Sequence, residues 1–221
     1  MDYAAQTAHL LIREFPQLIA GFLVTIGVAS AAIPLALILG LLLVVPRMAK
    51  SSAIAGAAIA YIELMRNTPL LAQIYLIYFG LPLLGLYPSE FTCGVAGIAL
   101  QHAAFMAETY RGGIESISPQ QWEAARAIGM RKLKVLRLVI LPQAIVRILG
   151  PLGNQMIILI KDTSLVSAIG VMELTMTAKM AIERSAASAE IFVAIGAFYL
   201  ILTTFVGAVV RLAEHYAAES N

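Results

Sequence analysis

The sequence EAARAIGMRKLKVLRLVILP, residues 123–142, decides how this chain is arranged relative to a membrane. It holds five of the fifteen lysine and arginine residues of the protein and interrupts a chain that is otherwise strongly apolar. Basic segments between apolar spans are retained on the cytoplasmic side of a membrane. We therefore expect residues 118–142, which we call the basic island, to lie in the cytoplasm, where a soluble protein can dock.

The composition points to a membrane protein before any motif is considered. Of the 221 residues, 60% are hydrophobic and 13% are charged, and the mean hydropathy is +0.86. Soluble domains carry about 25% charged residues. The single cysteine, Cys93, has no partner for an internal disulfide and is expected to be a packing residue. His9, His102 and His215 are scattered, so we expect neither a metal site nor a cofactor bound by this chain.

Five apolar stretches reach the length of about 20 residues that a spanning helix needs. They are residues 15–46, 52–86, 91–114, a stretch from 144 past 162, and 191–210. The expected fold class is therefore all-α, a polytopic membrane protein with about five transmembrane helices. No linker or repeat divides the chain, so we expect one domain over residues 1–221.

The placement of basic residues predicts the orientation. Arg47 and Lys50 lie in the first link and must share a side with the basic island, whereas the link over residues 82–90 has no lysine or arginine. The positive-inside rule then places the N-terminus outside and the C-terminus in the cytoplasm. Residues 169–189 fall outside and are expected to form a short amphipathic helix or loop, which either faces a binding protein or rests on the membrane surface.

The basic island contains signals for two short helices. Ser118 followed by Pro119 is typical of a helix start, and Gly129 predicts a break or bend. A second short helix is expected over residues 132–139, with Pro142 at the start of the fourth span. Charge alone leaves two roles open, docking of a protein and retention by anionic lipid.

The residue order in the island resembles the EAA loop of bacterial ABC importer permeases. Three further segments, ELMRNTPLL (63–71), AETYRGGI (107–114) and KDTSL (161–165), are similar to signatures of the polar amino acid permease family. Val139 stands where the EAA pattern usually has isoleucine. The island residues that carry the resemblance are Glu123, Ala124, Ala125, Gly129, Leu141 and Pro142.

This resemblance implies a MetI-like permease in the bacterial cytoplasmic (inner) membrane. The island would form coupling helices that dock on a cytoplasmic ABC ATPase dimer, and that dimer would bind ATP and magnesium. A second permease subunit, identical or homologous, would complete the pathway, and an extracytoplasmic amino-acid-binding protein would deliver the substrate. The implied substrates are cationic or neutral polar amino acids (arginine, lysine, histidine or glutamine), and no nucleic-acid partner is expected.

Charged residues at membrane depth are costly and need a partner or a cavity. Glu63 and Arg66 are three residues apart, so they share a helix face and can pair. Lys161 and Asp162 are adjacent and diverge by about 100° around a helix. One interpretation is internal pairing that only holds the helices together.

The other interpretation is a pocket for a zwitterion, with donors for its carboxylate and acceptors for its ammonium. Pro69 is expected to interrupt the helix beside this pocket, and some members of the family bind the amino acid inside the membrane. We also hypothesise that Asp162 favours cationic or neutral substrates over acidic ones. The candidate substrate-binding residues are Glu63, Arg66, Asn67, Thr68, Met106, Glu108, Lys161, Asp162 and Ser164.

Two other function classes compete with this assignment. A membrane hydrolase would need a catalytic set, but the sequence has no Gly-x-Ser-x-Gly, no His-Glu-x-x-His and no phosphate-binding Gly-x-x-x-x-Gly-Lys. We therefore expect the chain not to be an enzyme. An ion-coupled secondary amino acid transporter, with Glu63 or Asp162 carrying protons, is the alternative, but it leaves the basic island without a role.

Overall fold

The computed structural model describes residues 3–185 and 188–219, and every regular element in these ranges is a helix. This confirms the all-α class. The α-helices are α1 (Tyr3–Arg47), α2 (Ser52–Asn67), α3 (Leu70–Gly80), α4 (Glu90–Glu115), α5 (Pro119–Ala127), α6 (Lys132–Val135), α7 (Leu141–Asp162), α8 (Leu174–Ser185) and α9 (Ser188–Glu219). The shorter elements are two 3₁₀ helices, η1 (Leu81–Leu84) and η3 (Thr163–Ile169), and a π-helical segment, η2 (Leu136–Ile140).

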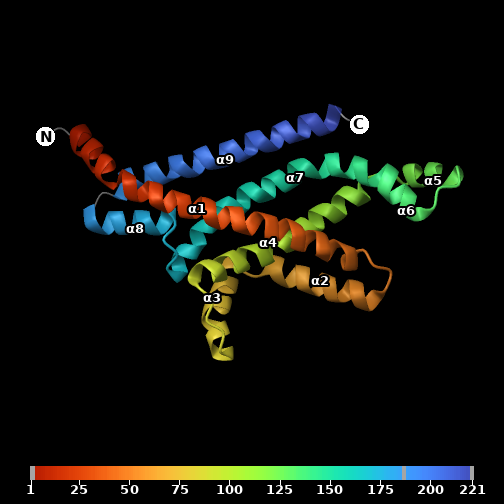
Figure 1. Ribbon diagram of the computed structural model, residues 1–221, viewed down its shortest axis with the longest axis horizontal. Helices are drawn as coiled ribbons and strands as arrows, with labels where there is room; N and C mark the ends of the chain where they lie inside the picture. Colours follow the sequence, from red (N-terminus) through yellow and green to blue (C-terminus); the bar gives the residue numbers. More distant parts are fainter. Residues whose placement is uncertain (1–2, 186–187, 220–221) are drawn as a thin grey trace.

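Helix α4 lies at the centre of the structure and packs against α1, α2, α3 and α7 (Figure 1). Its buried residues include Cys93, Ile98 and Met106, which join side chains of α1, α3, α7 and η3 in the largest hydrophobic core. Cys93 is a free, buried thiol, as expected. Because its neighbours cover it, α4 is the helix on which polar side chains can be held away from lipid.

The count of five spans is not confirmed. In the part of the chain that the structure describes, three helices are long and apolar enough to cross a membrane, namely Leu11–Arg47, Lys132–Ile169 and Ala189–Glu219. Helices α2 and α3 form a fourth if the broken pair is one span. Helix α4 is absent from this set. It carries Gln101, His102 and other polar residues, which a helix shielded by its neighbours can accommodate.

The second apolar stretch, predicted as residues 52–86, is broken sharply. Helices α2 and α3 are bent by 104° at the break. Thr68 there is extended, with φ −113° and ψ 145°, because the ring of Pro69 disfavours the helical conformation in the residue before it. The expected interruption at Pro69 is therefore confirmed.

The two ends of the molecule differ in what they carry. In Figure 1 the island helices α5 and α6, the α1–α2 link and the C-terminus lie toward one end, and the N-terminus and α8 lie toward the other. Lys50 of the link lines a pocket together with Trp122 and Glu123 of the island. This arrangement agrees with the expected shared side of link and island, while the side of the membrane that each end faces stays a prediction.

Candidate functional site

The first helix of the basic island ends in a glycine-dependent turn. Helix α5 begins at Pro119, as predicted, and Gly129 beyond its end has a φ of +82°. The Gly129 amide donates to the Arg126 carbonyl at 2.9 Å, and the Met130 amide donates to the Ala125 carbonyl at 3.2 Å. This pair of bonds is the Schellman motif, which needs a left-handed residue at the glycine position. The bend expected at Gly129 is confirmed.

The second island helix differs from the prediction. A separate helix was expected over residues 132–139, but α6 has only four residues and runs through η2 directly into α7. Pro142 has no amide hydrogen, so the regular bonding pattern is interrupted near it. The backbone widens into a π-helical segment, and the Gln143 side chain donates to the Val139 carbonyl at 2.7 Å. The fourth span is therefore continuous with the island.

The island is built on a small hydrophobic core of its own. Ala125 of α5 and Val135 of α6 pack with Ile117, Ile140 and Ala144, all of them buried. These residues connect the end of α4, both island helices and the start of α7. Burial of side chains from four segments makes the island a rigid unit rather than a solvated loop.

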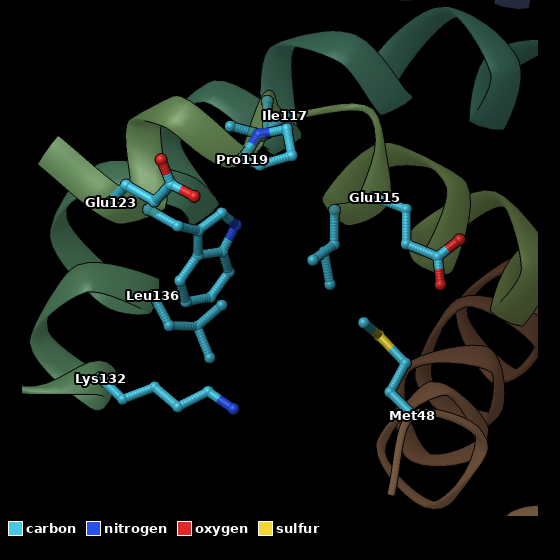
Figure 2. A pocket seen from close by; sticks show the side chains of 9 residues that line it. Met48, Glu115, Ile117, Pro119, Glu123, Lys132 and Leu136 are labelled. Carbon is cyan, nitrogen blue, oxygen red and sulfur yellow. The ribbon is translucent and has the colours of Figure 1, made fainter. Parts of the chain in front are cut away.

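A groove separates the island from the ends of α1 and α4. It has a volume of about 610 Å³, and Figure 2 shows Glu123, Lys132 and Leu136 on the island side, with Met48 and Glu115 across from them. Most of the lining is apolar, and the charges lie on the island and at the end of α4.

The residues of the predicted coupling motif divide into two groups. Glu123, Ala124 and Gly129 are exposed, so a partner can reach them. Ala125 is buried in the island core, and Leu141 and Pro142 are half-buried where α7 begins; these three serve packing and helix geometry.

At the break between α2 and α3, two glutamines satisfy the exposed helix carbonyls. The Gln73 side-chain amide donates to the carbonyls of Met65 at 2.9 Å and Thr68 at 3.3 Å. The Gln101 amide of α4 donates to the same two carbonyls at 3.0 and 2.9 Å. The Thr68 hydroxyl donates to the Leu64 carbonyl at 2.7 Å and accepts from Gln73. Thr68 therefore has a structural role at the break.

The expected pairing of Glu63 with Arg66 does not form: within residues 3–185 and 188–219, no ion pair joins them. The Arg66 guanidinium instead lies 5.2 Å from the ring centroid of Phe105 on α4. Glu63 and Asn67 are exposed. A guanidinium over an aromatic face is held by a cation–π interaction and keeps its donors free.

Glu108 is engaged on both carboxylate oxygens. Arg47 Nε donates to Oε1 at 2.8 Å, and Arg111 Nη2 donates to Oε2 at 2.7 Å. Glu108 follows His102 by six residues, a displacement of about 9 Å along α4. Glu108 thus joins the end of α1 to α4 and lies away from the other candidate substrate-binding residues.

Lys161 and Asp162 diverge, as their adjacency predicts. Asp162 Oδ2 lies 3.0 Å from His102 Nε2 of α4, and Lys161 is exposed. Ser164 is half-buried, and its carbonyl accepts from Ser167. Met106 is fully buried in the core and presents no surface to a ligand in this conformation.

Sequence reasoning missed two residues of this site, His102 and Phe105. Their rings are 6.2 Å apart, Phe105 carries Arg66, and His102 contacts Asp162, so α4 connects the predicted donor and the predicted acceptor. His102 is a polar residue inside an apolar stretch. A polar residue at membrane depth needs a partner or a cavity, as a charged residue does, and this signal could have identified His102.

Comparison with known proteins identifies the family. The model of the family described as "binding-protein-dependent transport system inner membrane component" matches residues 32–215. The chain belongs to this family. It is 38% identical over 201 residues to the glutamine transport system permease protein GlnP of Escherichia coli strain K12, covering 90% of this chain and 92% of GlnP.

Two further matches describe this inner-membrane component more closely. The nopaline transport system permease protein NocM of Agrobacterium fabrum is 36% identical over 216 residues, covering 93% of this chain and 90% of NocM. A crystal structure of an amino acid ABC transporter with histidines superposes with a TM-score of 0.89 at 34% identity, covering 98% of this chain and 99% of that chain. The resemblance to amino acid ABC permeases with the MetI-like fold is thereby confirmed.

Proposed function

We propose that this inner-membrane component is the permease subunit of a bacterial ABC importer for polar amino acids. It forms half of the substrate pathway, and a second permease subunit, identical or homologous, forms the other half. The basic island docks on a cytoplasmic ATPase dimer that binds ATP and magnesium, and an extracytoplasmic binding protein delivers the amino acid. Support comes from the similarity to permeases of glutamine and nopaline transport systems.

One observation carries the coupling role: the island and Asp162 belong to the same helical stretch. Helix α6 runs through η2 into α7, which ends at Asp162. Helix α7 has 22 residues, a length of about 33 Å. A displacement applied to the island core is carried along this rod, because packed helices move as rigid bodies between discrete arrangements.

The membrane orientation that we propose is supported by the positions of the basic residues. The island, the α1–α2 link and the C-terminus lie toward one end of the molecule (Figure 1). Their lysine and arginine residues support a cytoplasmic location for that end. The N-terminus and α8 then face the outside, where a binding protein reaches them.

The substrate site that we propose lies between Arg66 and Asp162. The Asp162 side chain is 32% exposed, so it is open to a ligand and not sealed in the core. Arg66 offers donors to a substrate carboxylate, and Asp162 offers an acceptor to an ammonium or a cationic side chain. A second carboxylate beside Asp162 is repelled, which favours cationic and neutral amino acids over acidic ones.

The coupling role is tested by capture of the ATPase. A tagged chain carrying Glu123→Ala and Gly129→Val should retain little of the ATPase that copurifies with the natural chain. Gln120→Ala, at an exposed position of the same helix, is the matched control and should leave capture unchanged. Equal capture by the double variant, at an unchanged melting temperature, would overturn the coupling role.

The energy source and the substrate are tested in the complete complex in proteoliposomes. Uptake of L-arginine should require ATP and persist when the proton gradient is collapsed, which separates the ABC importer from an ion-coupled transporter. Asp162→Asn should reduce the preference for L-arginine over L-glutamate. An unchanged preference would remove Asp162 from the substrate site while leaving the ATP-driven function intact.

A further inference from the structure

We propose that an anionic phospholipid binds between the basic island and the ends of α1 and α4. Its phosphate headgroup contacts the lysine and arginine side chains of a pocket on the island, and an acyl chain occupies the apolar groove of Figure 2. The lipid site lies outside the proposed substrate site and rests only on the proposed cytoplasmic location of the island.

The headgroup pocket, of about 440 Å³, collects positive charge. Its charged lining residues are Lys50 of the α1–α2 link and Glu123, Arg126, Arg131 and Lys132 of the island, and all five are exposed. Within residues 3–185 and 188–219, none of the four cations forms an ion pair. Cations gathered without counter-charges attract an anion, and basic pockets beside membrane helices on the cytoplasmic side bind phospholipid headgroups.

The apolar groove adjoins this pocket directly. Trp122, Glu123 and Lys132 line both, and Figure 2 shows the Lys132 side chain extending into the groove. Glu115, at the end of α4, is already paired with Arg111. A basic pocket that opens into an apolar groove is the complement of a molecule with an anionic head and a hydrocarbon chain. An acidic side chain of a protein partner would match only the pocket and would leave the groove unfilled.

The groove and the pocket lie where the apolar surface of two possible spans ends. The span Leu11–Arg47 ends just before Lys50, and the span Lys132–Ile169 begins in the pocket itself. Val45, in the last turn of α1, is 70% exposed, so the apolar surface of that helix continues to the groove. Trp122 is of the residue type that is enriched at the level of the headgroups. A phospholipid can therefore reach the pocket with its headgroup while its chains stay in the bilayer.

The chain carries its own reporter for this site, because Trp122 is its single tryptophan and lines both the pocket and the groove. The detergent-purified full chain is titrated with phosphatidylglycerol whose acyl chains are brominated, since bromine quenches tryptophan fluorescence on contact. Brominated phosphatidylcholine is titrated in parallel. Half-quenching by phosphatidylglycerol should occur at a mole fraction at least about tenfold below that for phosphatidylcholine, because several basic residues act on the headgroup.

Substitutions in the pocket test where the headgroup lies. Lys50→Gln and Lys132→Gln each remove one cation and keep a long polar side chain. Each should raise the mole fraction of phosphatidylglycerol at half-quenching about fivefold, the effect of one basic residue near anionic lipid, and should leave the phosphatidylcholine titration unchanged. The matched control is Lys134→Gln, at an exposed position of the same helix outside both linings, which should change the midpoint by less than about twofold.

Four outcomes would overturn the proposal. Equal quenching by the two lipids would show contact without preference for an anionic headgroup. Unchanged midpoints in both lysine variants, at unchanged melting temperatures, would remove the headgroup from the pocket. Recovery of the fluorescence on addition of soluble glycerol phosphate would indicate a site for free phosphate instead of a lipid. Lysine variants that lose capture of the ATPase but bind phosphatidylglycerol normally would assign the cations to the ATPase interface. Each of these outcomes leaves ATP-driven uptake, and with it the proposed importer function, intact.

Discussion

Glu173 offers a sharp test of how the end opposite the island is held together. It precedes α8, is fully buried, and lies between the segments Lys132–Ile169 and Ala189–Glu219 that are able to span the membrane. Its Oε1 accepts from the Met176 amide at 2.8 Å, which caps the helix start. Its Oε2 accepts from the Tyr199 hydroxyl of α9 at 3.1 Å and from the Thr25 hydroxyl of α1 at 3.4 Å. One carboxylate therefore joins three helices.

The size of the effect follows from these contacts. Glu173→Ala removes a helix cap worth about 1 kcal/mol and two hydrogen bonds from hydroxyls worth about 1 kcal/mol each. The free energy of unfolding should fall by about 3 kcal/mol. For a chain of this length, that loss lowers the melting temperature by roughly 6–12 °C.

The pH dependence has a definite sign. Burial raises the pKa of the Glu173 carboxyl above its ordinary value of 4.5. The folded protein then holds a proton that the unfolded chain has lost. The contribution of this proton to stability is complete below pH 4.5 and is lost as the pH rises through the raised pKa of the folded state.

Glu173→Gln separates the two effects. The amide keeps an acceptor for the Met176 amide and does not ionise, so the stability of this variant relative to the natural protein should increase from pH 4.5 upward. The measurement is the melting temperature of the detergent-purified protein between pH 4 and 8, with Glu173→Ala as the variant that loses the contacts. Parallel curves for the natural protein and Glu173→Gln would refute the reasoning.

Two further predictions concern helix contacts. A Cβ at Gly153 of α7 would lie 2.9 Å from Cγ2 and 3.0 Å from Cβ of Val210 on α9. Gly153→Ala should therefore lower the free energy of unfolding by about 1–3 kcal/mol, measured as a fall in melting temperature. The control is Gly196→Ala, whose added Cβ meets open space and should not lower stability. Glu108→Gln should lower stability by about 1–3 kcal/mol because it weakens charge-assisted bonds. A double-mutant cycle with Arg47→Gln should show a coupling energy between the two residues. A coupling energy of zero would show that the contact between α1 and α4 does not contribute to stability.

The features that sequence reasoning predicted correctly are those controlled by one or two neighbouring residues. Pro69 breaks a helix because it constrains its own φ and the conformation of Thr68, and Gly129 turns the chain because only glycine adopts a φ of +82° without strain. The start of α5 at Pro119 follows from the same kind of local chemistry. These effects do not depend on what packs nearby, so the sequence alone suffices.

The features that were missed depend on packing between distant segments. His102 and Asp162 are 60 residues apart, and only the crossing of α4 with α7 brings them together. Glu63 and Arg66 are three residues apart on one helix, but the Arg66 guanidinium contacts the Phe105 ring of α4 instead of Glu63. The count of five spans stays a prediction, since the shielding of α4 by its neighbours cannot be read from its own hydropathy.

The contact between His102 and Asp162 links the proposed substrate site to the coupling role that we propose for the island. Ile140 and Ala144 fix the start of α7 to the island core, so a displaced island takes α7 with it. Asp162 lies at the far end of that helix, but His102 belongs to α4, which is tied to α1 through Glu108. Under the proposed coupling, we expect motion of α7 relative to α4 to change this contact, so that the Asp162 carboxylate is fixed only in the arrangement that brings the two helices together.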